Sequence, residues 1–438
     1  MNIHLARSVE KVSLGAGEPA AWLLTRLARH NGYEDVAKFG SVIGVSEAEV
    51  RRGNQIDELS QIAGVDPNLV REWSPVGTSR VKARLRGEII RMPWDWRNPA
   101  IGRKVRFCPN CVAEDLRGGQ DTPARVPFVR AWWCLRDVHH CHVHGNVLLE
   151  TADTTSATIT ADLWSECAGR KVDIADTASI AADLYVLGRI GVTERVLMPG
   201  LDEFELGEAS AVLSWLGELA TVGKEALDIR SLPFGEAMGV RSAGLEIAKD
   251  WPNRIERRLQ ELFEMPRAGK GGPKAVYGRF YNRLYDQRFG RDGHEARTAL
   301  AQIVEEHALE RLPFGVDTTL FEKPTFSSKM VTLQHAALIS GFKKPDFIKV
   351  AAGMGIILEE GDELRRRGVE RALADDLADI RRRSLTGEEL ADEACLDLED
   401  IVRLKSSAVI APYLAGATPA MDLYHSDALQ TLMNREVL

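Results

Sequence analysis

The sequence predicts a mainly α-helical protein of several domains, with a small metal-binding module between two helical regions. Apolar residues recur at helical spacing through most of the chain, and two Cys/His pairs lie where that spacing fades. A length of 438 residues exceeds what one hydrophobic core usually organises. We expect an N-terminal helical, helix-turn-helix-like part, a zinc-knuckle module, a helical middle domain and a C-terminal domain of tandem helix-turn-helix-like units, at 1–75, 76–155, 156–325 and 326–438.

Composition excludes several classes of protein. A net charge of -8 argues against a uniformly basic nucleic-acid coat, and 45% hydrophobic residues is too many for a disordered chain. No apolar run approaches the ~20 residues that a membrane span needs, and the first residues lack the apolar core of a signal peptide. We therefore expect a cytoplasmic protein without a membrane partner. The charge is uneven, because 76–145 carries 13 basic and 6 acidic residues whereas 151–230 carries 6 and 14.

The N-terminal part begins with an amphipathic helix. Pro19 suits the first helical position, apolar residues such as Leu23 and Leu27 form one stripe, and Asn31-Gly32 ends the pattern. The stretch 59–70 predicts two short helices around Gly64, for which a helix-turn-helix and an ordinary helical hairpin remain open.

The middle of the chain has the pattern of a helical bundle. Ala, Leu and Glu recur at helical spacing over 176–265, and a Gly- and Lys-rich stretch at 267–274 predicts a flexible basic hinge. The helical pattern then resumes and stops near 312–315.

Cys108, Cys111, Cys141 and His144 are the predicted metal ligands. They form two pairs, each with two intervening residues, and such a pair lets one tight turn aim two ligands at one ion. Three Cys and one His complete a tetrahedron that leaves no position for a reactive water, so the sequence predicts a structural Zn2+ site. Four residues with chance spacing are the alternative.

The remaining Cys and nearby His residues carry a weaker signal. His139, His140 and His142 flank the second pair and are candidates for orienting the ligands. Cys134 is interpreted as a core residue, and Cys167 and Cys395 have no metal-binding partner nearby in the sequence.

Three stretches together resemble the signature of the TniQ family: FCPNCVAEDL at 107–116, FVRAWW at 128–133 and VHHCHVHGNVLL at 138–149. The opening helix, GEPAAWLLTRLARHNG at 17–32, is also similar to that of the family, although Pro-Ala-Ala replaces the usual Ser-x-x-Ser pattern. The family often has a second CxxC knuckle, whereas here only Cys167 occupies that region. One zinc site is therefore expected.

The resemblance implies a function. TniQ proteins, which include the TnsD-like target selectors, are non-catalytic targeting factors of heteromeric transposons. They mark a target DNA site, directly or through a CRISPR RNA-guided effector complex, and recruit an AAA+ ATPase that positions the transposase. Several members work as homodimers, so a homodimer is among the implied assemblies. The resemblance also implies a prokaryotic protein that associates with the nucleoid.

The C-terminal region predicts two helix pairs. In 331–352, Thr332 would cap the first helix, Gly341 would make the turn, and Lys343, Lys344 and Lys349 would lie on a recognition helix where DNA contacts are made. A plain helical hairpin is the alternative.

The second pair, at 385–404, repeats this layout with Thr386 as cap and Cys395 at the turn. Its second helix begins with acidic residues, which repel phosphates. We expect it to contact protein, or to reach DNA only through Arg403 and Lys405.

A basic stretch precedes the first Cys pair and offers further candidate nucleic-acid contacts, with a solvated surface as the alternative. These candidates are Arg84, Arg86, Arg103 and Lys104.

Two other classes of function compete with the targeting adaptor. A zinc-containing transcriptional regulator would bind an operator without an ATPase partner. A zinc-dependent nuclease or hydrolase is disfavoured because the predicted site is closed and the sequence contains no HExxH, no GxxxxGK[ST] loop and no GxSxG elbow. We therefore expect no catalytic activity.

Overall fold

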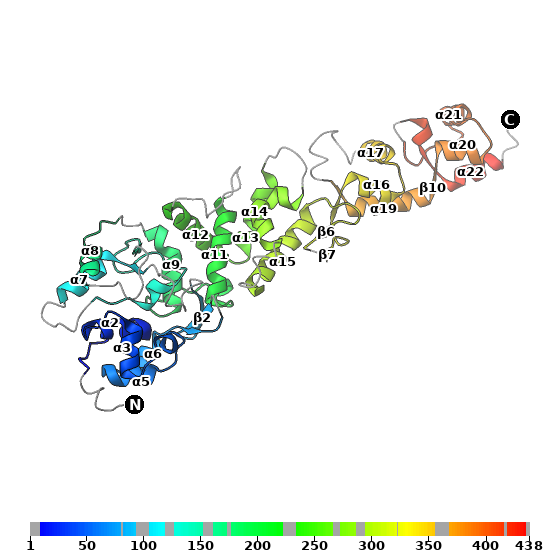
Figure 1. Cartoon of the computed structure of the whole chain (residues 1–438). Helices are drawn as coiled ribbons and strands as arrows, with labels where there is room; N and C mark the ends of the chain where they lie inside the picture. Colours follow the sequence, from blue (N-terminus) through cyan, green and yellow to red (C-terminus); the bar gives the residue numbers. More distant parts are fainter. Residues whose placement is uncertain are drawn as a thin grey trace. The chain divides into compact units, whose positions relative to one another are not determined.

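The structure is a computed structural model and is mainly helical, which confirms the predicted fold class (Figure 1). It describes residues 9–79, 82–92, 105–118, 127–151, 161–172, 177–221, 234–265, 272–285, 294–321, 323–354, 368–415 and 418–434. Two compact units are present. The first unit comprises Met1–Ile255 and Asp286–Thr298, and the second comprises Glu256–Tyr285 and Ala299–Leu438. The division into four domains stays a prediction.

The first unit begins with five short helices around one apolar core. They are α2 (Ala20–His30), α3 (Val36–Ile43), α4 (Glu47–Arg51), α5 (Ile56–Ala63) and α6 (Pro67–Glu72). Leu23, Leu24 and Leu27 of the predicted stripe are fully buried. The first helix begins at Ala20, so Pro19 occupies the N-cap and not the first helical position that was predicted for it. Gly64 ends α5 in the left-handed conformation, as the turn requires.

Short strands and one helix frame the Cys/His region. Strands β1 (Val76–Gly77), β2 (Lys82–Leu85) and β3 (Glu88–Arg91) form an antiparallel sheet, and β4 (Arg106–Phe107) pairs with β5 (Leu149–Glu150) beside α7 (Pro109–Gly118).

An aromatic contact joins this region to the N-terminal helices. The rings of Trp73 and Trp132 meet edge to face with 5.4 Å between centroids, and Gly17 lies against the Trp132 ring. A Cβ at Gly17 would lie 2.2 Å from that ring, so only glycine allows this approach. The helices and the Cys/His region therefore pack as one body.

Helices complete the first unit: α8 (Ala161–Ala168), α9 (Thr177–Arg189), α10 (Pro199–Asp202), α11 (Leu206–Thr221) and α12 (Phe234–Ala248). Arg189 on α9 donates two hydrogen bonds to the Glu88 carboxylate on β3, at 2.9 and 2.7 Å, which fixes the helices to the sheet. The second unit includes most of α13 (Asn253–Glu264), α14 (Pro273–Tyr285) and most of α15 (His294–Arg311), followed by the hairpin of β6 (Thr319–Leu320) and β7 (Lys323–Pro324). Most of the predicted hinge lies outside the described residues.

Both predicted C-terminal helix pairs are present. The first contains β8 (Met330–Val331), α16 (Leu333–Ser340), α17 (Lys344–Gly353), β9 (Val369–Glu370) and α19 (Arg371–Arg382). The second contains β10 (Ser384–Thr386), α20 (Gly387–Glu393), α21 (Leu398–Ser406), β11 (Leu423–His425) and α22 (Ser426–Met433). Thr332 and Thr386 cap their helices as predicted. No helix in the described part of the chain is long and apolar enough to cross a membrane.

Candidate metal centre

Two turns present the four predicted ligands to one point. Cys108 follows β4 and Cys111 lies in the first turn of α7, while Cys141 and His144 occupy a turn whose flanks pair at His140 and Val147. The amide of Gly145 donates to the Cys141 carbonyl at 2.8 Å, and Gly145 has a φ of 67°, which lets the chain leave the turn. The predicted clustering is therefore observed.

The distances between the ligand atoms suit a tetrahedral ion. Cys111 Sγ lies 3.5 Å from Cys141 Sγ, and His144 Nδ1 lies 3.5, 3.4 and 3.6 Å from the sulfurs of Cys108, Cys111 and Cys141. A tetrahedron with Zn–S bonds of ~2.3 Å and a Zn–N bond of ~2.0 Å has edges of about 3.5 to 3.8 Å. The three Cys are buried, and the four residues form a cluster that can hold a metal ion.

Two further side chains hold the ligands in place. His144 Nε2 lies 3.0 Å from Glu114 Oε1, so Nδ1 is left to face the centre. The Asn146 amide donates to Cys108 Sγ at 3.8 Å. Hydrogen bonds among the three thiols lower the pKa of Cys141 and raise the pKa of Cys111, so the three groups share their protons as one coupled set. Sequence reasoning missed the role of Glu114, although its place three residues after Cys111 on a helix is a usable signal.

Beside the centre, His140 belongs to a buried polar network. His140 Nδ1 lies 2.8 Å from Asp183 Oδ2, and both the His139 and His140 amides donate to the same oxygen. Arg241 donates to Asp183 Oδ1 at 3.0 Å and to the carbonyl of Asp137 at 3.0 Å. Burial raises the pKa of Asp183, but the His140 hydrogen bond and the Arg241 charge outweigh it and hold the pKa below its usual value. Asp183 on α9 and Arg241 on α12 therefore hold the backbone beside the turn that carries Cys141 and His144.

The other residues of this region do not add ligands. The ring of His142 packs edge-on against Trp132 at 5.6 Å, and Cys134 Sγ lies 3.9 Å from the Arg130 carbonyl. Cys167 is buried on α8, and burial raises its pKa to about 11. Among the described residues, one Cys/His group of this kind is found.

The candidate nucleic-acid residues fall in different parts of the chain. Lys343, Lys344 and Lys349 are exposed at the start and along α17 of the second unit. Arg84 is exposed on β2 in the first unit, whereas Arg86 pairs with Glu72 at 2.9 Å and stacks on Trp73 at 4.5 Å. Arg103 and Lys104 lie outside the described residues. Their DNA contacts stay a prediction.

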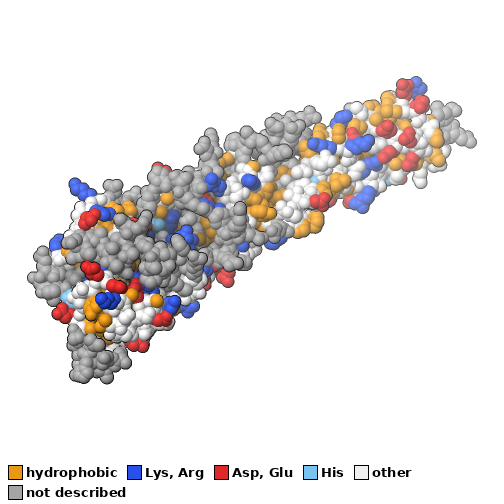
Figure 2. Space-filling model, in the orientation of Figure 1, with side chains coloured by type: hydrophobic (Ala, Val, Ile, Leu, Met, Phe, Trp, Pro, Cys, Tyr) orange, Lys and Arg blue, Asp and Glu red, His pale blue; other side chains and the backbone are white. Residues whose placement is uncertain are grey.

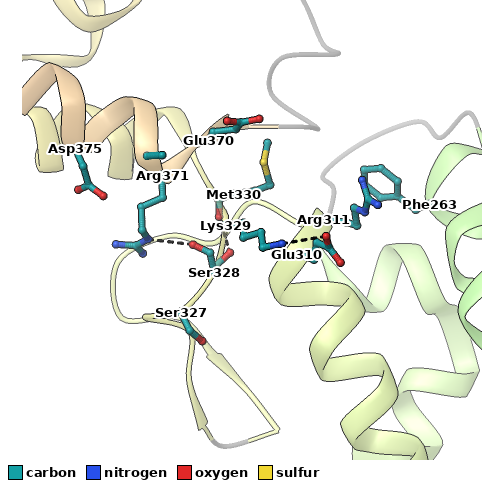
Figure 3. Close-up of a pocket in the computed structure, with 11 residues that line it drawn as sticks. Phe263, Glu310, Arg311, Ser327, Ser328, Lys329, Met330, Glu370, Arg371 and Asp375 are labelled. Atoms are coloured by element: carbon teal, nitrogen blue, oxygen red, sulfur yellow. Dashed lines mark hydrogen bonds and ion pairs between the residues drawn. The ribbon is translucent and has the colours of Figure 1, made fainter. Parts of the chain in front are cut away.

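A pocket of about 640 Å³ lies between α15 and the first C-terminal helix pair (Figure 3). Lys329 Nζ lies 3.1 Å from Glu310 Oε1 in this pocket, and Arg371 Nε donates to the Ser328 carbonyl at 3.0 Å. The lining contains charges of both signs, which does not favour a ligand of one charge.

Comparison with protein families agrees with the geometry. The TniQ family model matches residues 11–148, a range that contains all four ligands. Residues 11–148 are therefore similar to a TniQ domain, which confirms the expected family resemblance. The TniQ domain ends before α9 and α12, so the Asp183 and Arg241 side chains that lock its second turn come from outside the matched range. No curated protein matches the chain.

Proposed function

We propose that this chain is a non-catalytic targeting adaptor for DNA transposition, with one structural Zn2+ ion in its TniQ domain. The observation that carries the proposal is that the family match coincides with a closed set of three Cys and one His. The four ligands would fill a tetrahedral coordination sphere. A bound ion would then stabilise the two turns and would activate no water.

The adaptor would connect a DNA site with a protein machine. The exposed Lys343, Lys344 and Lys349 support direct contact of α17 with DNA, because helix-turn-helix proteins place this helix in the major groove. The family supports recruitment of an AAA+ ATPase, and it also includes members that reach the target through a CRISPR RNA-guided complex. We favour direct DNA contact because the three lysines are exposed to solvent on the second helix of a helix-turn-helix pair.

Reconstituted transposition tests the proposal. The assay combines the chain with the ATPase and transposase encoded beside it and a library of target DNA. We expect targeted insertion to require the chain, and the triple variant K343E/K344E/K349E to lose target choice while zinc content is unchanged. Insertion that is indifferent to the chain would refute the adaptor function, and a requirement for added guide RNA would refute direct recognition. Specific operator binding without any effect on insertion would favour a transcriptional regulator.

A further inference from the structure

The two C-terminal helix pairs are copies of one fold. We name 330–382 the first repeat and 384–433 the second repeat. Each runs strand, capped helix, turn, second helix, returning antiparallel strand and closing helix. The capping residues Thr332 and Thr386 are 54 positions apart, and the same offset separates the left-handed turn residues Gly341 (φ 74°) and Cys395 (φ 55°).

Equivalent positions keep the same role in the core. Phe347 and Ile401, again 54 positions apart, are both 0% exposed, and Ala337 and Ala391 are both buried where the two helices cross. The returning strands also correspond, because Val331 pairs with Val369 and Leu385 pairs with Tyr424. The scaffold is therefore retained, and differences on its surface reflect what each repeat contacts.

The start of the second helix is where the surfaces diverge. Lys343 and Lys344 of the first repeat correspond to Asp397 and Leu398 of the second. Over 387–402 the second repeat has seven acidic residues and no Lys or Arg. A surface of this sign repels phosphates, so it does not favour the DNA contacts that we propose for the first repeat. The next basic residues, Arg403 and Lys405, pair with Asp400 and Asp422.

An apolar groove of about 380 Å³ occupies that place in the second repeat. It is lined by Leu398, Glu399, Val402, Arg403, Thr418, Pro419 and Ala420. Leu398 is 37% exposed although it is a large aliphatic residue at a helix start. On the visible face of the C-terminal part, acidic, basic and hydrophobic side chains lie next to one another (Figure 2).

We infer that this groove docks a protein segment in which an aliphatic or aromatic side chain is flanked by Lys or Arg. The apolar side chain would cover Leu398 and Val402, and the basic side chains would face Glu399. Asp397 and Asp400 form the capping box of α21, and Asp400 also lies 3.5 Å from Arg403, which lines the groove as well. An apolar anchor with a charged rim is the usual composition of a specific peptide site. The inference depends on the surface of the second repeat and goes beyond the role of the chain in transposition.

Fluorescence anisotropy with the full-length chain tests the inference. The probe is a labelled 12-residue peptide with one central Leu between Lys and Arg residues, and control peptides carry Ser for Leu or Glu for the basic residues. We expect saturable binding of the first peptide alone. The variants L398S and E399K should each weaken it about tenfold, a change typical of an interface hot spot.

Two matched variants separate this site from general charge and hydrophobicity. L338S removes an exposed leucine from the first repeat, and D376K reverses an exposed carboxylate on α19. Both should leave peptide binding unchanged, and L398S should leave binding of a DNA duplex unchanged. Absence of saturable peptide binding, equal weakening by L338S, or weaker DNA binding by L398S would overturn the inference. Circular dichroism of each variant verifies that it is folded.

Discussion

His144 Nε2 lies 3.0 Å from Glu114 Oε1, so a carboxylate on α7 orients a ligand that comes from the opposite turn. The two halves of the metal centre are 30 residues apart in the chain, and this contact fixes one against the other. Such carboxylate–histidine contacts set the ring orientation and raise the basicity of the ligand nitrogen.

Removing that carboxylate should weaken metal binding. We expect Glu114→Gln to reduce zinc affinity by about 10- to 100-fold, the usual effect of losing a partner of a ligating His. Competition with a chromophoric chelator measures the affinity. The exposed Glu256→Gln is the control and should bind zinc like the parent protein. Equal affinities for all three proteins would show that Glu114 does not orient His144.

The purified chain should contain about one zinc ion. Cys108→Ser should lose the ion and destabilise the surrounding region, because the metal supplies folding free energy that the short strands there lack. Elemental analysis and limited proteolysis measure the two effects. Cys395→Ser, at an exposed turn, should change neither. A Cys108→Ser protein with full zinc content would contradict the ligand assignment.

The buried carboxylate of Asp183 should be important for stability. Asp183→Asn leaves Arg241 without its charge partner, and breaking a buried pair in this way costs about 3–5 kcal/mol. Denaturant unfolding followed by tryptophan fluorescence gives the change. Asp57→Asn, which breaks the exposed pair with Arg71, should cost less than about 1 kcal/mol. Similar losses for both variants would argue against the network.

The second unit should lose stability below neutral pH through His307. Burial lowers the pKa of His307 to about 4, and the neutral ring accepts from Tyr277 Oη at 2.8 Å while Nε2 faces Gln260. In the unfolded chain, His307 would bind a proton with a pKa near 6.5. The stability that the neutral His307 contributes is therefore fully present above pH 6.5 and is lost as the pH falls from about 6.5 to 4.

Thermal melting at pH 7 and pH 5 measures this effect, which we place at about 1–2 kcal/mol because the ring is partly exposed. His307→Gln should melt at a lower temperature at pH 7 and show a smaller pH dependence. His425→Gln, at an exposed His, should keep the dependence of the parent protein. An unchanged pH profile for His307→Gln would contradict the assignment.

DNA binding should depend on the lysines of α17. Reversing Lys343 and Lys344 should weaken binding to every sequence, and the slope of log K against log salt should fall by about one for each phosphate that is no longer neutralised. Titrations at several salt concentrations measure the slope. Lys323→Glu, at an exposed lysine that pairs with Glu305, is the control and should retain the parent slope.

Local patterns predicted much of this structure. The helix caps Thr332 and Thr386 follow from residue type and local spacing, and the structure confirms both. It also brings the four predicted ligands together, as their spacing predicted. The pairing of Asp183 with His140 and Arg241 was not predictable, since it joins residues 43 and 58 positions apart that leave no periodic signal. Arg86 was also not predictable. It was a candidate nucleic-acid contact because it lies in a basic stretch, but it forms an ion pair with Glu72.

The contacts of Asp183 and Arg241 with the turn that carries Cys141 and His144 have a consequence for the design of shorter fragments of this chain. A fragment that ends at residue 148 would keep every predicted metal ligand but would lose Asp183, which contacts the buried His140, and Arg241, which pairs with Asp183. An isolated fragment of this chain should therefore extend through α12 to Ala248 to keep this buried pair. The stretch that folds as one piece would then be longer than the range matched by the family model.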